Sequence, residues 1–223
     1  MDFRHEWKHI ISYSDLLVLR SRLAAVMQWD AHTVNGKYMV RSLYFDSLSD
    51  KALREKIDGV NPREKFRIRY YNDDTSFIIL EKKSRVNGMC SKEQAELSLA
   101  EVQSVLDGNM HELAGNKKEL LKELYLKMNL QGLRPKIIVD YIREPFVCGA
   151  GNVRVTLDYD IRVGMGCTDF LSTGCVTIPV CGAPVILEVK YDGFLPSVIR
   201  DIVQTAGTQT SAFSKYAACR MYG

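Results

Sequence analysis

Long hydrophobic runs are missing from this sequence. No apolar stretch approaches the roughly 20 residues that a helix needs to cross a bilayer, because charged residues interrupt every candidate. We therefore expect no membrane-spanning segment, although a separate membrane partner stays open. The N-terminal residues also lack the apolar core of a secretion signal, so we expect a cytoplasmic protein.

The composition excludes several other classes. The six cysteines form no Cys-x-x-Cys pair and no Cys/His metal spacing, so we expect reduced thiols. The net charge is only +3, so any anion site must come from the placement of the 30 lysines and arginines. Internal repeats and low-complexity linkers are absent, and we predict a single domain over residues 1–223.

Basic residues recur at every second position of short strand-like segments. The clearest segment is Lys65-Phe-Arg67-Ile-Arg69, and others contain Lys83, Arg143, Arg154 and Lys190. Because side chains on a strand alternate between its faces, each segment places its charges on one side and its apolar residues on the other. Neighbouring cations on one face are roughly 6.6 Å apart and repel by about 2 to 3 kcal/mol at an effective dielectric near 20. We expect an anion to bind among them.

The patterns of strands and helices predict an α+β protein. Strand patterns cover Phe3–Ile11, Tyr38–Phe45, 65–72, 76–83, Pro135–Val147, Val153–Val163 and Val185–Tyr191. Helical patterns follow Ser14 as N-cap, extend over 100–128 with a break at His111–Asn116, and follow Pro196.

A barrel with helices packed on its outside would bury the apolar face of every strand and enclose the charges in a wet lumen. The alternative is a sheet whose polar face is exposed to solvent, which is the commonest fate of a single alternating strand.

Glu188 differs from the other acidic residues of these segments. It follows the apolar Val185-Ile-Leu187, so we expect it to be buried and to need a cation or a metal to stay charged. Its oxygen ligands suit Mg²⁺ or Mn²⁺. For Glu6 and Glu81, which have a lysine at the same spacing, a plain salt bridge is the favoured interpretation.

Seven motifs, taken in order, resemble the VTC (vacuolar transporter chaperone) polyphosphate polymerase domain of the triphosphate tunnel metalloenzyme (CYTH-like) superfamily. They are Arg41-Ser-Leu-Tyr-Phe-Asp46, Lys65-Phe-Arg67-Ile-Arg69-Tyr70, Leu80-Glu-Lys-Lys83, Tyr141-Ile-Arg143, Arg154-Val-Thr-Leu-Asp158, Leu187-Glu-Val-Lys190 and Phe213-Ser-Lys215-Tyr216. The resemblance extends from about Arg4 to Tyr216. It implies a closed antiparallel eight-stranded β-barrel with helices packed on the outside. Within this tunnel the γ-phosphoryl of ATP, or of another nucleoside triphosphate, passes to a polyphosphate chain with the help of Mn²⁺ or Mg²⁺.

The same resemblance implies the roles of individual residues. The catalytic cations would be Lys8, Arg67, Arg69, Lys83, Arg143, Arg154 and Lys215. The substrate-binding residues would be Arg41, Lys65, Lys92, Tyr141, Lys190 and Ser214, and Glu188 would hold the metal. The chain begins with His5-Glu6-Trp7-Lys8 and lacks a full Glu-x-Glu-x-Lys, which places it closer to the polymerases than to the simple triphosphatases.

Two other functions stay open. An inorganic tripolyphosphatase would use the same tunnel with water as the acceptor, and a non-catalytic polyphosphate-binding module would use the same cations without turnover. Tyrosines beside the basic residues could stack on nucleobases, but a lumen that binds only a triphosphate tail accounts for them with fewer assumptions. We therefore expect no nucleic-acid partner.

Overall fold

The computed structural model describes residues 4–87, 89–109, 115–205 and 209–222, which form two compact units. Unit 1 contains Met1–Met39, Tyr141–Ile161 and Pro179–Ser214. Unit 2 contains Val40–Asp140, Arg162–Ile178 and Lys215–Gly223. Strands β3 (Tyr38–Asp46), β7 (Arg134–Cys148), β8 (Val153–Val163) and β9 (Ile178–Pro179) contribute residues to both units. The single domain predicted for residues 1–223 stays a prediction.

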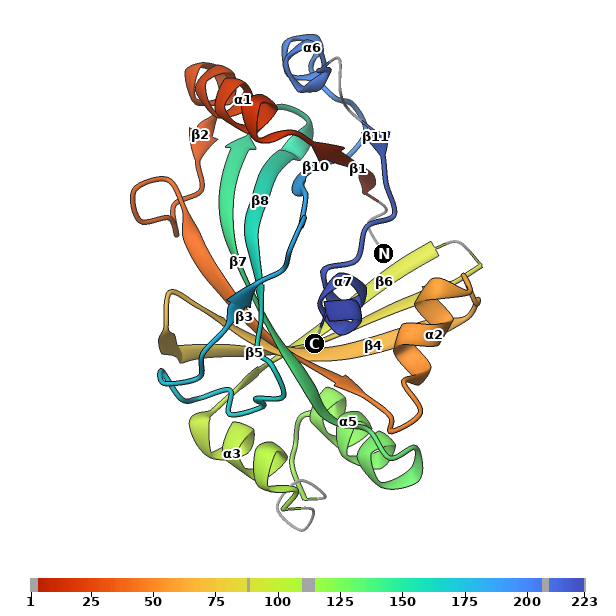
Figure 1. Cartoon of the computed structure of the whole chain (residues 1–223). Coiled ribbons are helices and arrows are strands. Elements are labelled where there is room, and N and C mark those ends of the chain that lie inside the picture. The colour runs from red at the N-terminus through yellow and green to blue at the C-terminus, as the bar shows by residue number, and fades with distance from the viewer. Residues whose placement is uncertain (1–3, 88, 110–114, 206–208, 223) are drawn as a thin grey trace. The chain divides into compact units, whose positions relative to one another are not determined.

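Unit 1 is built on an antiparallel sheet in the order β11-β1-β10-β8-β7. Its remaining elements are β1 (His5–Ile11), α1 (Tyr13–Val26), β2 (Gln28–Trp29), η1 (Ala150–Asn152), β10 (Val185–Tyr191), α6 (Ser197–Val203) and β11 (Gln209–Thr210). Helices α1 and α6 lie side by side (Figure 1). Their apolar residues, including Leu19 and Ile199, share one buried cluster with Val155 and Leu187 of the sheet. One face of this sheet therefore packs against α1 and α6 and forms the core of unit 1 with them.

Helix α1 begins two residues earlier than the sequence predicts. Its N-cap is Ser12 instead of Ser14, because Ser12 has the extended backbone that an N-cap requires (φ −77°, ψ 166°). The Ser12 hydroxyl accepts the N–H of Asp15, and the Asp15 carboxylate accepts the N–H of Ser12 in return. This reciprocal capping box satisfies two backbone donors at the start of the helix.

Unit 2 is built on an antiparallel sheet in the order β7-β3-β4-β5-β6. Its remaining elements are α2 (Lys51–Ile57), β4 (Arg63–Tyr71), β5 (Asp74–Val86), β6 (Met89–Leu97), α3 (Leu99–Asp107), α5 (Glu119–Leu130) and α7 (Lys215–Tyr222). Figure 1 shows α3 and α5 beside each other, and both contact β5. Their residues Val105 and Leu124 share a buried cluster with Leu43, Ile68 and Leu80 of the sheet.

Most of the predicted elements of unit 2 are confirmed. Strands β4 and β5 form the predicted hairpin, and its turn residues Asn72 and Asp73 both have positive φ (51° and 56°), as a two-residue hairpin turn requires. Helices α3 and α5 occupy the predicted helical region, and residues 110–114 of the predicted break lie outside the described residues. The sequence patterns missed strand β6 and helix α7.

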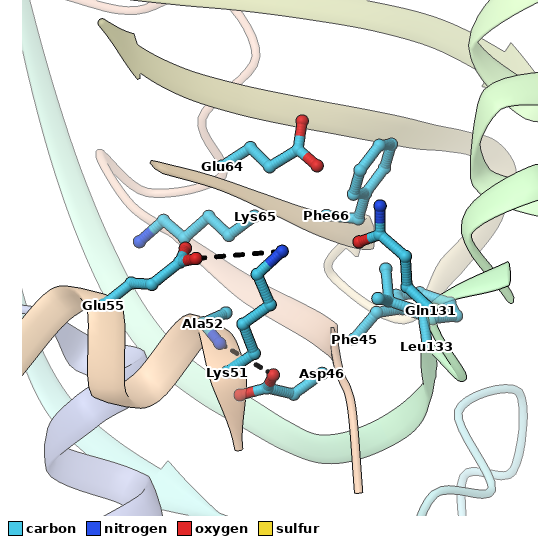
Figure 2. A pocket seen from close by; sticks show the side chains of 10 residues that line it. All are labelled: Phe45, Asp46, Lys51, Ala52, Glu55, Glu64, Lys65, Phe66, Gln131 and Leu133. Atoms are coloured by element: carbon cyan, nitrogen blue, oxygen red, sulfur yellow. Dashed lines mark hydrogen bonds and ion pairs between the residues drawn. The ribbon is translucent and has the colours of Figure 1, made fainter. Parts of the chain in front are cut away.

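Asp46, at the end of β3, connects α2 and α7. Its carboxylate accepts the backbone N–H groups of Ala52 and Leu53, at 2.9 and 3.1 Å, and the hydroxyl of Tyr216. Burial and the neighbouring Asp46 carboxylate raise the pKa of the Tyr216 phenol. Figure 2 shows the small pocket beside α2, which Asp46 lines together with Lys65. Asp46 therefore connects α7 to the first turn of α2.

The strand pairing shows that the predicted closed eight-stranded barrel is wrong. Among the described residues, the pairing in unit 1 starts at β11 and that in unit 2 ends at β6, and in neither unit does the sheet close on itself. Alternation along a strand specifies which face each side chain occupies, but it does not specify which edge strands pair. The α+β class and the antiparallel pairing are confirmed, whereas the enclosed lumen stays a prediction.

Two further expectations concern cysteines and membrane helices. All six cysteines are free thiols. In the part of the chain that the structure describes, no helix is both long enough and apolar enough to cross a membrane.

Candidate functional site

In unit 2 the face opposite the core carries five of the predicted basic residues, Lys65, Arg67, Arg69, Lys83 and Lys92. Leu43, Ile68 and Leu80 belong to the buried cluster, so their strand neighbours point the other way. The registers of β3, β4, β5 and β6 align these neighbours in four rows, which we call the cation ladder. The rows are Arg63–Arg85–Cys90, Lys65–Lys83–Lys92, Tyr44–Arg67–Glu81–Gln94 and Ser42–Arg69–Ile79–Glu96.

The cation ladder has a large excess of positive charge. Its rows contain seven lysines and arginines but only two carboxylates, those of Glu81 and Glu96. Three lysines, Lys65, Lys83 and Lys92, are paired directly across β4, β5 and β6. Like charges directly opposite each other on a sheet are destabilising. The residues of this face therefore favour a bound polyanion.

Glu81 is the buried carboxylate of the ladder. It contacts Arg67 at 2.7 Å, Lys92 at 2.5 Å and also Arg69, and only 2% of its side chain is exposed. Burial alone would raise the pKa of this carboxyl group, but the three cations outweigh it and lower the pKa to about 2. In the opposite direction, burial lowers the pKa of the Lys92 ammonium despite the contact with Glu81. The predicted plain salt bridge at Glu81 thus orders three cations at once.

Tyr44 was not among the predicted site residues, yet it supports two of them. Its hydroxyl accepts a hydrogen bond from Arg67 at 2.8 Å, and the Lys65 ammonium lies 5.7 Å from its ring centroid. On its other side the Tyr44 ring lies 5.0 Å from that of Tyr216 in α7. The signal was available, because Tyr44 is two residues before Asp46 and six after Tyr38, the start of the strand, in phase with the charged face.

In unit 1 a second charged cluster lies on β1 and β10. The registers pair Glu6 with Lys190 and Lys8 with Glu188, so charges of opposite sign alternate in both directions. Lys8 lies 3.2 Å from Glu188 and 3.3 Å from Glu6, and Lys190 lies 3.4 Å from Glu188. Burial opposes the charge on Lys8, but the two glutamates outweigh it and raise the pKa of the ammonium group. Glu188 is 8% exposed, so its predicted burial is confirmed.

Arg143 connects this cluster to Asp158. Its guanidinium donates two hydrogen bonds to the Asp158 carboxylate, at 2.6 and 2.7 Å, and lies 3.9 Å from Glu188. It also lies over the ring of Tyr141, 5.4 Å from the centroid. Burial opposes the charge on Arg143, but Asp158 outweighs it and raises the pKa of the guanidinium. The predicted site residues Tyr141 and Arg143 are therefore in direct contact with each other.

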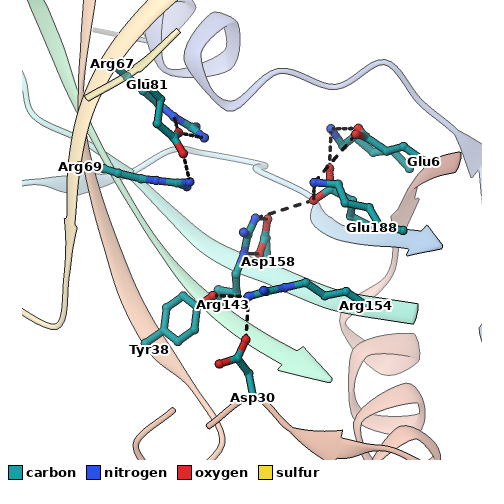
Figure 3. Close-up of polar contacts among 12 residues, drawn as sticks. Glu6, Asp30, Tyr38, Arg67, Arg69, Glu81, Arg143, Arg154, Asp158 and Glu188 are labelled. Carbon is teal, nitrogen blue, oxygen red and sulfur yellow. Dashed lines mark hydrogen bonds and ion pairs between the residues drawn. The ribbon is translucent and has the colours of Figure 1, made fainter. Parts of the chain in front are cut away.

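Arg154, on β8, is held by two residues that the sequence analysis missed. It donates to the Tyr38 hydroxyl at 3.0 Å and forms an ion pair with Asp30 at 3.0 Å (Figure 3). Tyr38 belongs to a predicted strand, whereas Asp30 follows β2 and carries no sequence signal that separates it from other loop acids. Asp30 thus fixes the position of Arg154 from outside the sheet.

The residues around Glu188 fit a divalent metal only in part. Among the described residues, no group of three His, Cys, Asp or Glu side chains is arranged to hold a metal ion. Mg²⁺, however, is commonly bound through one or two carboxylates and the phosphates of the substrate. The oxygens of the buried Glu188 supply such a hard donor. The donor set therefore suits a metal that arrives with a phosphorylated substrate.

Three predicted residues, Arg41, Ser214 and Lys215, belong neither to the rows of the cation ladder nor to the cluster on β1 and β10. Arg41 alternates with Ser42 and Tyr44, and its guanidinium binds Asp140 at 2.9 Å and the carbonyl of Ser172 at 3.2 Å. Arg41 was predicted to bind substrate. It is only 6% exposed, and its guanidinium forms a buried ion pair with Asp140. Ser214 immediately precedes α7, and Lys215 is its first residue.

Helix-backed antiparallel sheets with charged faces opposite their cores define an α+β protein. The family model described as "VTC domain" matches residues 3–222. The chain therefore belongs to the VTC domain family, and the resemblance drawn from its motifs is confirmed. No curated protein is close enough in sequence to count as a match.

Solved structures share the fold at low sequence identity. A candidate adenylate cyclase from Bacillus halodurans is 15% identical, with a TM-score of 0.52 over 85% of this chain and 80% of the other. The PH1819 protein from Pyrococcus horikoshii is 12% identical, with a TM-score of 0.53 over 99% of this chain and all of the other. At this sequence identity the likenesses show a shared fold.

Proposed function

We propose that this protein is a polyphosphate polymerase-type phosphotransferase that moves the γ-phosphoryl group of ATP onto a polyphosphate chain. The observation that carries the proposal is the cation ladder, in which seven basic side chains share one face with two carboxylates. Membership of the VTC domain family supports it. The ladder covers about 20 Å along the strands at 3.3 Å per residue, which is longer than one triphosphate needs.

The transfer requires little covalent chemistry from the protein. A terminal oxygen of the polyphosphate attacks the γ-phosphorus, a new P–O bond forms, and the bond between that phosphorus and the β,γ-bridging oxygen breaks to release ADP. Phosphoryl transfer is catalysed mainly by alignment and by neutralisation of the charge on the transferring group. Arg67 and Arg69 can each bind phosphate oxygens through two donors, whereas Lys83 and Lys92 act as point charges.

Glu188 would hold a Mn²⁺ or Mg²⁺ ion, which neutralises phosphate charge when bound. Around it, Lys8, Lys190 and Arg143 already contact the carboxylate and orient it. Because these cations are long side chains, they can exchange Glu188 for phosphate oxygens when a substrate arrives.

The test is to incubate the purified protein with ATP and Mn²⁺, and to resolve the products by gel and by phosphate release. Polyphosphate chains that lengthen with time support the proposal. Release of orthophosphate without chains supports a tripolyphosphatase instead. If neither product forms but polyphosphate binds, the protein is a polyphosphate-binding module.

A further inference from the structure

Two buried polar groups lie side by side at the inner end of the cation ladder. Ser42 on β3 and Arg69 on β4 are direct register partners, so their Cβ atoms are roughly 5 Å apart. Ser42 is fully buried, and Arg69 is 7% exposed. Within the described residues, neither the Ser42 hydroxyl nor the Nε of Arg69 has a hydrogen-bond partner.

Both groups can donate a hydrogen bond, and both lie on the charged face. The adjacent residues Leu43 and Ile68 belong to the core, so Ser42 and Arg69 point away from it. The other end of the Arg69 guanidinium is already bound to Glu81 and lies 5.5 Å from the ring centroid of Tyr71. Its Nε is therefore presented from a fixed orientation.

Buried donors without acceptors are costly, at about 1 to 3 kcal/mol for each group. In native proteins such a group usually marks a functional site or an ordered water or ion. Here two of them are adjacent, and the next row beyond them, Val40–Tyr71–Asp74, contains no further cation. The cation ladder thus ends at two hydrogen-bond donors that have no acceptor oxygen.

We infer that Ser42 and Arg69 form a subsite for one non-bridging oxygen of the terminal phosphate of a bound polyanion. The inference rests on the proposed function and adds a residue, Ser42, that fixes the position of the polymer end along the ladder. Arg67 and Lys92 contact the same Glu81 carboxylate as Arg69 and reach solvent, with 24% and 47% of the side chain exposed. The ammonium group of Lys92 is carried on a flexible stem and can move aside to let a phosphate reach the subsite.

The decisive variant is Ser42→Ala, studied with sodium tripolyphosphate by isothermal titration calorimetry. Loss of a hydrogen bond to a charged oxygen is expected to weaken binding by about tenfold or more. Because the hydroxyl has no protein partner, the melting temperature is expected to stay unchanged or to rise. Ser42→Thr, which retains a hydroxyl, is expected to recover part of the affinity.

Ser104→Ala is the matched control. Ser104 is also a buried serine of unit 2, but its hydroxyl donates to the carbonyl of Ala100 within α3, on the core side of the sheet. This variant is expected to bind tripolyphosphate as the unmodified protein does. If Ser42→Ala binds as tightly as the unmodified protein, the subsite is refuted and the proposed function survives. If the unmodified protein itself fails to bind tripolyphosphate, both are refuted.

Discussion

Arg143 and Asp158 form a two-point ion pair in which only 1% of the Asp158 side chain is exposed. The pair joins β7 to β8. It leaves the Arg143 guanidinium 3.9 Å from the Glu188 carboxylate. A guanidinium held by two hydrogen bonds loses little further entropy when it binds a phosphate. Asp158 therefore determines where Arg143 can act.

We expect Asp158→Asn to destabilise the protein by about 3 to 5 kcal/mol, because it leaves the buried Arg143 charge without its partner. Chemical denaturation followed by circular dichroism measures the change. The control is Glu119→Gln, since Glu119 pairs with Lys122 at the surface with 86% of its side chain exposed. That variant is expected to lose less than about 1 kcal/mol. Equal losses in both variants would contradict the structural role of the buried pair.

Glu188→Gln is expected to abolish phosphoryl transfer and leave a folded protein. The amide keeps the shape of the side chain but removes the charge that would hold the metal and that orders Lys8 and Lys190. Product analysis with ATP and Mn²⁺ measures activity, and electron paramagnetic resonance of Mn²⁺ measures metal binding.

Glu93→Gln is the control for this change. Glu93 lies on β6 and contacts Lys82, which is on the core side of the sheet together with α5. We expect it to keep both activity and Mn²⁺ binding. An active Glu188→Gln protein would disprove the metal assignment.

Arg67→Ala is expected to weaken tripolyphosphate binding by about 1.5 to 3 kcal/mol, the usual range for a hydrogen bond to a charged group. Arg67 is bound to both Glu81 and Tyr44, so it is ordered before substrate arrives. Titration calorimetry at a fixed salt concentration measures the loss. Lys122→Ala removes a cation from the exposed side of α5, and unchanged affinity is expected there. Similar losses in the two variants would indicate a general effect of charge instead of a site.

The depressed pKa of Glu81 predicts a pH dependence of stability. Its pKa is about 2 in the folded protein against an ordinary value of 4.5, so the folded state favours the ionised form. The stabilisation is fully present above about pH 5 and is lost as the pH falls from the ordinary value toward the folded one. We expect Glu81→Gln to be less stable than the unmodified protein at pH 7.

The difference in unfolding free energy between these two proteins should narrow as the pH approaches 2. Denaturation at a series of pH values between 7 and 2 measures it. The comparison of the two proteins removes the contribution of Glu101, whose pKa is also lowered to about 2. A difference that is constant over this range would show that Glu81 does not titrate as proposed.

Much of the candidate site follows from local pattern. The alternation in Lys65-Phe-Arg67-Ile-Arg69 predicted that the three cations share one face, and the register of β4 confirms it. The burial of Glu188 likewise followed from the apolar residues before it. These features depend on neighbours within a few residues, because the two-residue period of a strand is a local property of the backbone.

Contacts between distant segments could be read only from the tertiary structure. Arg41 and Ser42 are adjacent in sequence, yet strand pairing places Arg41 against Asp140 and Ser42 opposite Arg69. The partners of Arg154, Tyr38 and Asp30, are more than 100 residues away along the chain. The sequence by itself determined the family, the α+β class and the charged faces, since each is encoded in short motifs. Only the folded chain decided which strands pair and which edges stay open, because pairing depends on surfaces that far-separated residues form together.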